Sequence, residues 1–198
     1  GEMGLNDTGL ILEIVDRVVA NHSVDESRVY LTGWSNGCSL SQKLANDHSD
    51  VFAAIACMSY YLLEDPSPDY SPIPVMEIHG LEDQIILYSN DAIHLPNMDA
   101  QKHGAIQNLQ QWGNMNGCGD KAPDSNSPSV FYSVQSFTDC GNGTEVALVT
   151  IYAADHNPYE EGIGVFVGNG GTVDTNGIAW EFLSRFSKEI EEEASARA

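Results

Sequence analysis

The sequence is poor in basic side chains and has no long apolar run. Only 8 Lys and Arg stand against 29 Asp and Glu, which gives a formal net charge of −21. Such a field repels phosphate backbones and anionic lipid headgroups, so we expect neither nucleic acid nor a membrane surface as partner. No apolar stretch approaches the roughly 20 residues that span a bilayer. The His and Cys spacings of metal centres are absent too, so we expect no metal, no cofactor and a neutral or salt-tolerant substrate.

The 198 residues suffice for one domain with a substantial core, and neither repeats nor an internal linker divide them. Apolar periodicity predicts helices at 8–20, 36–46, 100–116 and 176–190, with Asp7 or Thr8 capping the first. It predicts strands at 28–32, 51–57, 75–78, 130–134 and 146–152, the last two as an antiparallel hairpin. This alternation indicates an α/β fold, a mainly parallel sheet flanked by helices, in a single domain 1–198.

The most informative segment is Gly33-Trp34-Ser35-Asn36-Gly37, which lies between a predicted strand and a predicted helix. A G-x-S-x-G turn in this context is typical of a nucleophile elbow, which projects the serine hydroxyl above the sheet edge. We expect both glycines to be there because side chains beside the serine would clash. The backbone N–H of Asn36 is the expected oxyanion donor. The alternative interpretation is a surface turn rich in Gly and Ser.

A serine hydroxyl is a weak nucleophile until a histidine takes its proton and a carboxylate orients that histidine. In folds built on this elbow the order is Ser, acid, His, each just beyond the carboxyl end of a strand. Among the six histidines only His156 directly follows the last predicted strand. Glu82 and Asp83 both follow the strand at 75–78, so position alone leaves the acid open. His79, at the end of that strand, is interpreted as a packing residue of the turn.

The four cysteines fall into two groups. Cys118 and Cys140 lie in Gly- and Asn-rich loops, where a covalent link between loops would stabilise most. Cys38 and Cys57 lie at the start of the elbow helix and the end of the next strand, and either a bridge or two buried thiols fits them. Disulfides would place the protein outside the cytosol.

These segments resemble the esterase family that includes polyhydroxybutyrate depolymerases, feruloyl esterases and acetyl-xylan-type esterases of the α/β-hydrolase fold. The resemblance implies a secreted serine carboxylic-ester hydrolase that forms an acyl-enzyme on short-chain, aryl or polyester substrates. The family's His-Gly-x-x-Asp turn selects Asp83 as the acid beside Ser35 and His156, and its hairpin disulfide pairs Cys118 with Cys140. The similar segments are 24–37, 52–56, 79–88, Trp112 with 116–118 and Cys140, and 178–186.

The chain departs from this family in two places. Where the family has Gly-Gly-His-Thr-Trp-Pro, residues 154–159 read Ala-Asp-His-Asn-Pro-Tyr, so the tryptophan wall of the pocket is missing. The family's N-terminal strands and their oxyanion loop are also missing, which predicts an N-terminally truncated sheet whose bare edge either pairs with another copy or depends on an upstream segment. A catalytically impaired scaffold or binding module, and a serine peptidase of the same fold, are the alternatives. Candidates for lining the pocket, or else ordinary loop residues, are Trp34, Met58, Tyr60 and Tyr61.

Overall fold

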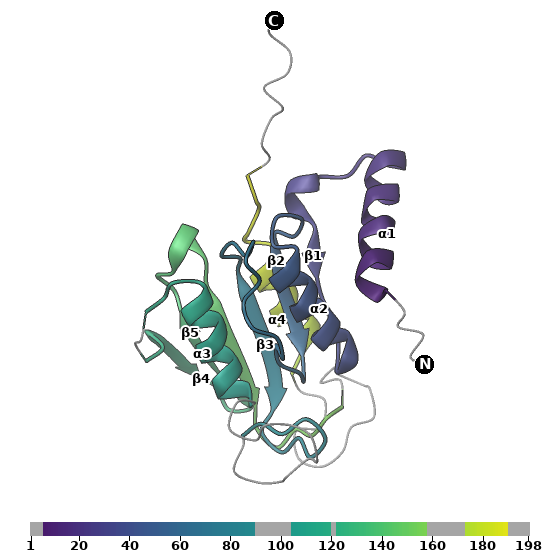
Figure 1. Ribbon diagram of the computed structural model, residues 1–198. Coiled ribbons are helices and arrows are strands. Elements are labelled where there is room, and N and C mark those ends of the chain that lie inside the picture. Colours follow the sequence, from purple (N-terminus) through teal and green to yellow (C-terminus); the bar gives the residue numbers. More distant parts are fainter. Residues whose placement is uncertain (1–5, 90–103, 120–121, 158–172, 190–198) are drawn as a thin grey trace, which may run out of the picture.

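A single mixed sheet organises the molecule (Figure 1). The computed structural model describes residues 6–89, 104–119, 122–157 and 173–189. Within these ranges six strands pair in the order β1-β2-β3-β6-β5-β4. The first three of these and β6 run parallel, whereas β5 is antiparallel to both of its neighbours. The strands are β1 (Tyr30–Leu31), β2 (Ala54–Met58), β3 (Val75–Gly80), β4 (Ser125–Pro128), β5 (Tyr132–Phe137) and β6 (Val146–Ile151).

Helices cover both faces of the sheet. They are α1 (Asp7–Asn21), α2 (Asn36–Asp47), α3 (Ala105–Met115) and α4 (Thr175–Leu183). Helices α2 and α3 pack on one face and α4 on the other, as Figure 1 shows. This layering confirms the predicted α/β architecture. No helix within the described residues is long and apolar enough to cross a bilayer.

The parallel strands are buried on both faces, so their alternating side chains fill two separate cores. Side chains that face α2 and α3 include Ile55, Val75 and Leu148. Their sequence neighbours on the same strands, including Ala56, Met76 and Val149, face α4. This two-sided burial explains why β2, β3 and β6 are largely apolar rather than alternating with polar residues.

Several predicted boundaries are wrong at the ends of elements. Strand β1 has only two residues, because Glu26–Arg28 form a 3-10 turn before it. The second strand begins at Ala54 rather than at residue 51. Helix α4 ends at Leu183, and residues 184–189 continue without helix. The cap of α1 is Asn6, whose Oδ1 accepts a hydrogen bond of 2.9 Å from the backbone of Gly9. Residues 100–103 and 190 of predicted helices lie outside the described residues.

Strand β4 (Ser125–Pro128) had no counterpart in the sequence prediction. Its residues are polar or proline and are mostly exposed, so no apolar alternation marks them. They join the sheet through backbone pairing with β5 alone, at the outermost position. Proline is tolerated on such an edge because one side of the strand needs no donor.

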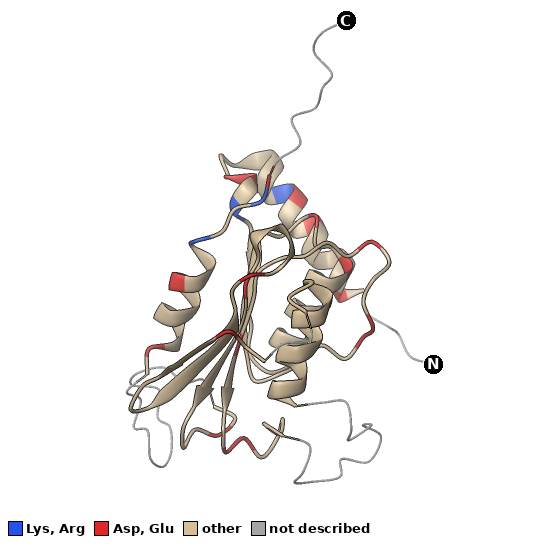
Figure 2. Cartoon of the chain, turned by 90° about the vertical axis from the view of Figure 1, so that its left-hand side faces the viewer, with Lys and Arg blue, Asp and Glu red and all other residues tan. Residues whose placement is uncertain are grey.

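Among the described residues the acidic ones are spread over the fold, whereas the few basic ones gather toward one end (Figure 2). There Arg28 donates to the carbonyl of Ser184, and Lys188 donates to the carbonyl of Asp50. Arg185 pairs with a glutamate at 2.9 Å. A pocket that includes Arg185 and Lys188 in its lining opens beside the residues that precede β2, β3 and β6. These basic groups therefore lie at the amino-terminal ends of the parallel strands.

Candidate active site

The opposite edge of the sheet, at the carboxyl ends of the parallel strands, brings the three predicted triad residues together. Ser35 follows β1, Asp83 follows β3 and His156 follows β6. The Nε2 atom of His156 lies 2.9 Å from the Oγ atom of Ser35. Its Nδ1 atom lies 2.8 Å from Oδ2 of Asp83. This is the arrangement in which an imidazole can take a proton from a hydroxyl while a carboxylate fixes its tautomer.

The turn at Ser35 is strained in the way a nucleophile elbow requires. Ser35 has φ 54° and ψ −122°, a backbone conformation that residues other than glycine rarely adopt. Two backbone hydrogen bonds of 2.9 Å hold it against β2, one from Ser35 N–H to the Met58 carbonyl and one from Met58 N–H to the Gly33 carbonyl. The serine therefore sits on a turn that its neighbours over-determine.

The two glycines of the motif differ. A Cβ atom on Gly33 would lie 2.4 Å from both the carbonyl carbon and the carbonyl oxygen of Gly37, so this position excludes any side chain. A Cβ atom on Gly37 would meet nothing within 4 Å. The prediction that both glycines avoid a clash is thus right for Gly33 and wrong for Gly37.

The acid turn and the histidine loop are tied to each other by backbone bonds. Leu81 N–H donates to the carbonyl of Ile151, and Glu82 N–H donates to the carbonyl of Ala154. This arrangement turns the Asp83 side chain inward, where it is buried, and leaves Glu82 exposed. It is Asp83, not Glu82, whose carboxylate contacts His156.

Asp83 is held as a carboxylate. Burial opposes its ionisation, but hydrogen bonds from His79, His156 and the backbone outweigh burial and lower the pKa of Asp83. Its Oδ1 atom accepts from the N–H groups of Ile85 and Ile86, each at 2.9 Å. An ionised, fixed acid keeps the proton of the neutral His156 ring on Nδ1, which leaves Nε2 free to act as a base toward Ser35.

Trp34 contacts the histidine loop directly. Its indole Nε1–H donates to the backbone carbonyl of His156 at 2.8 Å, and the two ring centroids lie 5.3 Å apart. The side chain is 42% exposed, so it borders the site while still clamping the loop. Asn36 is the first residue of α2, where backbone N–H groups have no partner within the helix.

The other predicted pocket residues are buried or half-buried, so they are less accessible than residues that line an open pocket. Met58 is buried in the core that faces α4. Tyr61 is buried too, with its ring stacked on His79 at 5.8 Å and its hydroxyl donating to the carbonyl of Leu87. Tyr60 is half-buried beside Tyr61. Their part in lining a substrate pocket stays a prediction.

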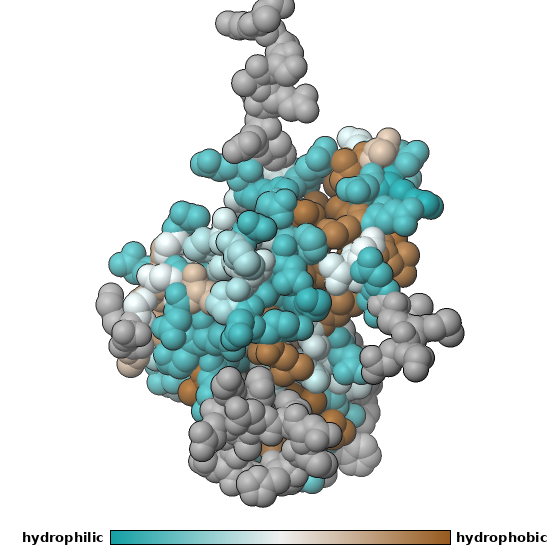
Figure 3. All heavy atoms as spheres, in the orientation of Figure 1, coloured by the Kyte–Doolittle hydropathy of each residue, from teal (hydrophilic) through white to brown (hydrophobic). Residues whose placement is uncertain are grey.

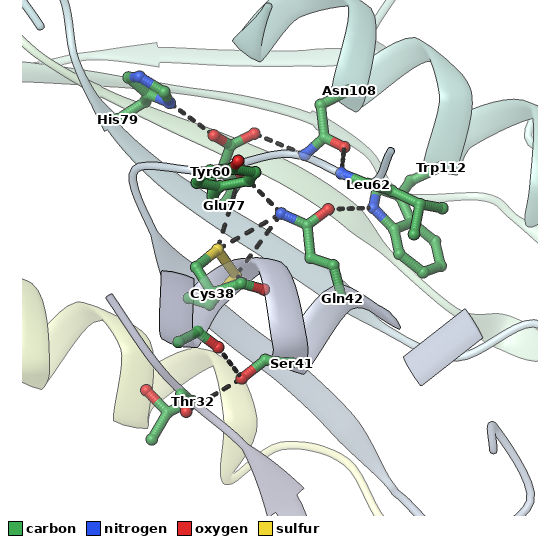
Figure 4. The surroundings of a disulfide bond; sticks show 12 residues. Thr32, Cys38, Ser41, Gln42, Tyr60, Leu62, Glu77, His79, Asn108 and Trp112 are labelled. Carbon is green, nitrogen blue, oxygen red and sulfur yellow. Dashed lines mark hydrogen bonds and ion pairs between the residues drawn. A yellow bond between two sulfur atoms is a disulfide. The ribbon is translucent and has the colours of Figure 1, made fainter. Parts of the chain in front are cut away.

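Two disulfides brace the scaffold. Cys38–Cys57 joins the first turn of α2 to β2, which resolves the alternative that the sequence left open. Cys118–Cys140 joins the end of α3 to the segment between β5 and β6, as the family resemblance implied. Beside the first bridge lies the buried amide of Gln42, which donates to the carbonyl of Tyr60 and accepts from the indole of Trp112 (Figure 4). Covalent and polar contacts thus fix helix α2, which follows the elbow, against the rest of the fold.

Sequence reasoning missed a buried polar group behind the acid. Glu77 and Asn108 are each 2% exposed, and they lie between His79 and the backbone of Leu62 (Figure 4). One signal was visible in the sequence, because Glu77 interrupts the otherwise apolar part of β3. A charge in a strand covered on both faces requires a partner.

Comparison with known proteins adds to this geometry. The chain is 24% identical over 188 residues to feruloyl esterase B of Piromyces equi, covering 92% of the chain and 32% of that protein. It is 22% identical over 184 residues to a bifunctional acetylxylan esterase/xylanase of Neocallimastix patriciarum, covering 93% of the chain and 24% of the relative. The chain thus spans about a third or less of the length of these curated relatives.

A solved structure supports the fold. The acetyl xylan esterase from Aspergillus awamori superposes with a TM-score of 0.61 at 14% identity, covering 90% of this chain and 67% of that one. This likeness and the mostly parallel sheet flanked by helices identify an α/β-hydrolase fold. The family model described as esterase PHB depolymerase matches residues 1–143. The chain therefore belongs to the polyhydroxybutyrate depolymerase family of esterases.

Proposed function

We propose that the chain is a serine carboxylic-ester hydrolase that works through an acyl-enzyme. The observation that carries this proposal is the continuous hydrogen-bonded path from Ser35 through His156 to Asp83. Ser35 Oγ attacks the acyl carbonyl as its proton passes to Nε2 of His156. The backbone N–H of Asn36 donates to the oxyanion that forms.

Once the tetrahedral intermediate has formed, His156 acts as an acid instead of a base. The imidazolium of His156 gives its proton to the leaving alcohol, and the C–O bond of the tetrahedral intermediate breaks to leave an acyl-Ser35 ester. Water then loses a proton to His156 and attacks that ester. As the second tetrahedral intermediate breaks, the imidazolium returns this proton to Oγ of Ser35, which restores the serine and releases the acid. The carboxylate of Asp83 stabilises the imidazolium in both steps without taking its proton.

The names of the relatives suggest the substrate class. They are called feruloyl esterase, acetylxylan esterase and, for a 46-residue segment with 48% identity, poly(3-hydroxyalkanoate) depolymerase. We infer that the substrate is a short-chain, aryl (feruloyl-type) or polyester ester. A neutral ester suits a chain with a net charge of −21. The two disulfides support a secreted protein, because such bonds persist in oxidising compartments.

A fluorophosphonate probe and a series of p-nitrophenyl esters test this mechanism, beside methyl ferulate and polyhydroxybutyrate as substrates. Ser35→Ala should abolish both labelling and turnover, and Asp83→Asn should lower kcat by about 10⁴-fold because the wrong tautomer of the histidine is then favoured. Glu82→Gln is the matched control, since its side chain is exposed, and it should be nearly silent. Labelling that persists in Ser35→Ala would refute the proposal.

We also infer a self-association surface at the outer edge of β1. Within the described residues β1 is an edge strand, paired with β2 alone. Beside it α1 exposes Leu10, Ile14 and Val18, and apolar surface appears along this side in Figure 3. Unpaired strand edges next to apolar surface favour pairing with another chain. Light scattering should therefore detect a homo-oligomer, and a strictly monomeric, fully active chain would contradict this.

A further inference from the structure

His79 lies behind the acid of the triad, with both of its ring nitrogens against acceptors. Its Nε2 atom is 2.7 Å from the backbone carbonyl of Ile86. A carbonyl can only accept, so Nε2 carries a hydrogen. Its Nδ1 atom is 2.6 Å from Oε1 of Glu77. Both side chains are almost fully buried, so water does not complete either contact.

The contacts of the other carboxylate oxygen of Glu77, Oε2, determine where the proton between Glu77 and His79 can lie. Oε2 of Glu77 lies 2.6 Å from Nδ2 of Asn108, while Oδ1 of Asn108 accepts from the backbone N–H of Leu62 at 3.0 Å (Figure 4). Because the Asn108 oxygen is occupied by that N–H, its amide nitrogen must face Glu77. Oε2 of Glu77 is therefore an acceptor, and the one proton between Glu77 and His79 lies between Oε1 and Nδ1.

The groups around the ring decide where that proton resides. Asp83 Oδ2 lies 3.4 Å from Nε2 of His79, so a second carboxylate faces the ring. Tyr61 stacks on the ring and Tyr88 meets it edge-on, both at 5.8 Å. Burial raises the pKa of both phenols, so they remain neutral. Burial disfavours the charge of His79, but the hydrogen bonds to Asp83 and Glu77 prevail and raise the pKa of His79 to about 9. Burial also raises the pKa of Glu77, and the hydrogen bonds from His79 and Asn108 oppose that rise, so the geometry of these contacts places the proton on Nδ1 of His79.

We propose that Glu77 and His79 are positioning residues of the active site. In this proposal a buried Glu77 carboxylate keeps His79 as an imidazolium, and that cation holds the acid turn of Asp83 in place. The inference rests on the serine mechanism proposed above and adds two residues behind Asp83, the first in charge contact with it at 3.4 Å. His79 anchors the carbonyl of Ile86, and the N–H of Ile86 donates to Asp83, so the cation fixes the acid through the turn as well as through its charge.

The negative charge of Glu77 has its own role. An unbalanced imidazolium would lie about 6 Å or less from the ring of His156, because both rings face Oδ2 of Asp83 from 3.4 and 2.8 Å. Such a cation would oppose the positive charge that His156 acquires during turnover. Glu77 neutralises it, so that Asp83 retains its full effect on His156.

Nuclear magnetic resonance of protein labelled with ¹⁵N-histidine tests the charge without requiring activity. Both ring nitrogens of His79 should be protonated from pH 5 to 8, in the parent chain and in Ser35→Ala. In Glu77→Gln the amide can satisfy both neighbours, so the fold survives and His79 should lose one proton near pH 7. Asn46→Ala is the control, since this buried amide lies at the far end of α2 and should leave His79 unchanged.

The pH profile of kcat/KM tests the coupling to the triad. At an effective dielectric of about 20, losing a cation about 6 Å from the catalytic base moves the acidic limb of the profile up by about 2 pH units, and losing the more distant anion offsets about half of that. The acidic limb of Glu77→Gln should therefore move up by about 1 unit, with kcat about tenfold lower and KM within about twofold. Asn46→Ala should move none of these.

Two results would overturn the proposal. One is a parent chain in which a ring nitrogen of His79 is unprotonated throughout pH 5–8. The other is a Glu77→Gln variant whose acidic limb coincides with that of the parent. If instead Ser35→Ala retained turnover, the serine mechanism would fail, while the resonance measurement would still decide the charge of His79.

Discussion

Replacing Gly33 with alanine should break the elbow, whereas the same change at Gly37 should not. The added methyl group at Gly33 would sit 2.4 Å from two backbone atoms of Gly37. Real contacts of a Cβ atom are never this short, and a backbone group cannot rotate out of the way as a side chain can. The start of α2 must therefore move away from β1, and Ser35 lies between the two.

The expected cost follows from that geometry. Overpacking a well-packed site typically destabilises a protein by 1–3 kcal/mol. Because the methyl group of Gly33→Ala would clash with two backbone atoms of Gly37, we expect a cost near the upper value, about 3 kcal/mol. Alanine at Gly37 meets no atom within 4 Å and lies in the first turn of α2, so it should gain about 0.5 kcal/mol from the lower chain entropy of the unfolded state. The two variants add the same methyl group at different positions, and they should change the free energy of unfolding in opposite directions.

Urea unfolding of both variants with the disulfides intact decides the question. With a denaturant slope of about 2 kcal/mol per molar, Gly33→Ala should lower the midpoint by about 1.5 M and also abolish turnover. Gly37→Ala should leave the midpoint level or slightly higher. A Gly33→Ala midpoint within about 0.3 M of the parent, or an equal loss at Gly37, would refute the steric reasoning.

Three further outcomes are expected. Trp34→Phe removes the donor to the carbonyl of His156 and should lower kcat about tenfold, while Trp180→Phe, at an exposed position, should be silent; equal effects would contradict the clamp. Replacing both cysteines of Cys118–Cys140 by serine should cost about 3 kcal/mol of unfolding free energy by calorimetry, and an unchanged midpoint would count against it. Because the folded pKa of His79 is about 9 against an ordinary 6.5, its stabilisation should be complete below pH 6.5 and disappear as pH rises through 9, which urea titrations at several pH values would measure.

The grouping of the three candidate triad residues could be predicted from the sequence because it depends on topology. Parallel strands deliver their carboxyl ends to one edge, so a serine, an acid and a histidine that follow three strands of the parallel part of the sheet meet there. The structure places Ser35 and His156 within 2.9 Å of each other although 121 residues separate them. The choice of Asp83 over Glu82 needed the family pattern. Both residues follow β3, and only the conformation of the turn directs the side chain of one of them inward.

Features that depend on packing between elements could not be predicted in this way. Strand β4 exists only through its pairing with β5, because none of its own residues mark it as a strand. The bond between Cys38 and Cys57 depends on how closely α2 approaches β2, which composition does not reveal. His79 was interpreted as a packing residue, and the stacked ring of Tyr61 agrees with that, but its two hydrogen-bond partners lie on different segments and emerge only in three dimensions.

Backbone strain occurs at the edge of the sheet that carries the candidate active site, and neighbouring contacts hold it in place. Ser35, Ser59 and Ala153 all have positive φ, and each follows directly or closely the carboxyl end of a parallel strand. Strained backbone of this kind costs on the order of 1–3 kcal/mol per residue and persists only where the surroundings over-determine it. For Ser35 those surroundings are the paired bonds to β2 and the close approach of Gly33 to α2. A substitution that relaxed the elbow would therefore relieve strain and at the same time move Oγ away from His156, so stability and catalytic geometry cannot be improved independently at this turn.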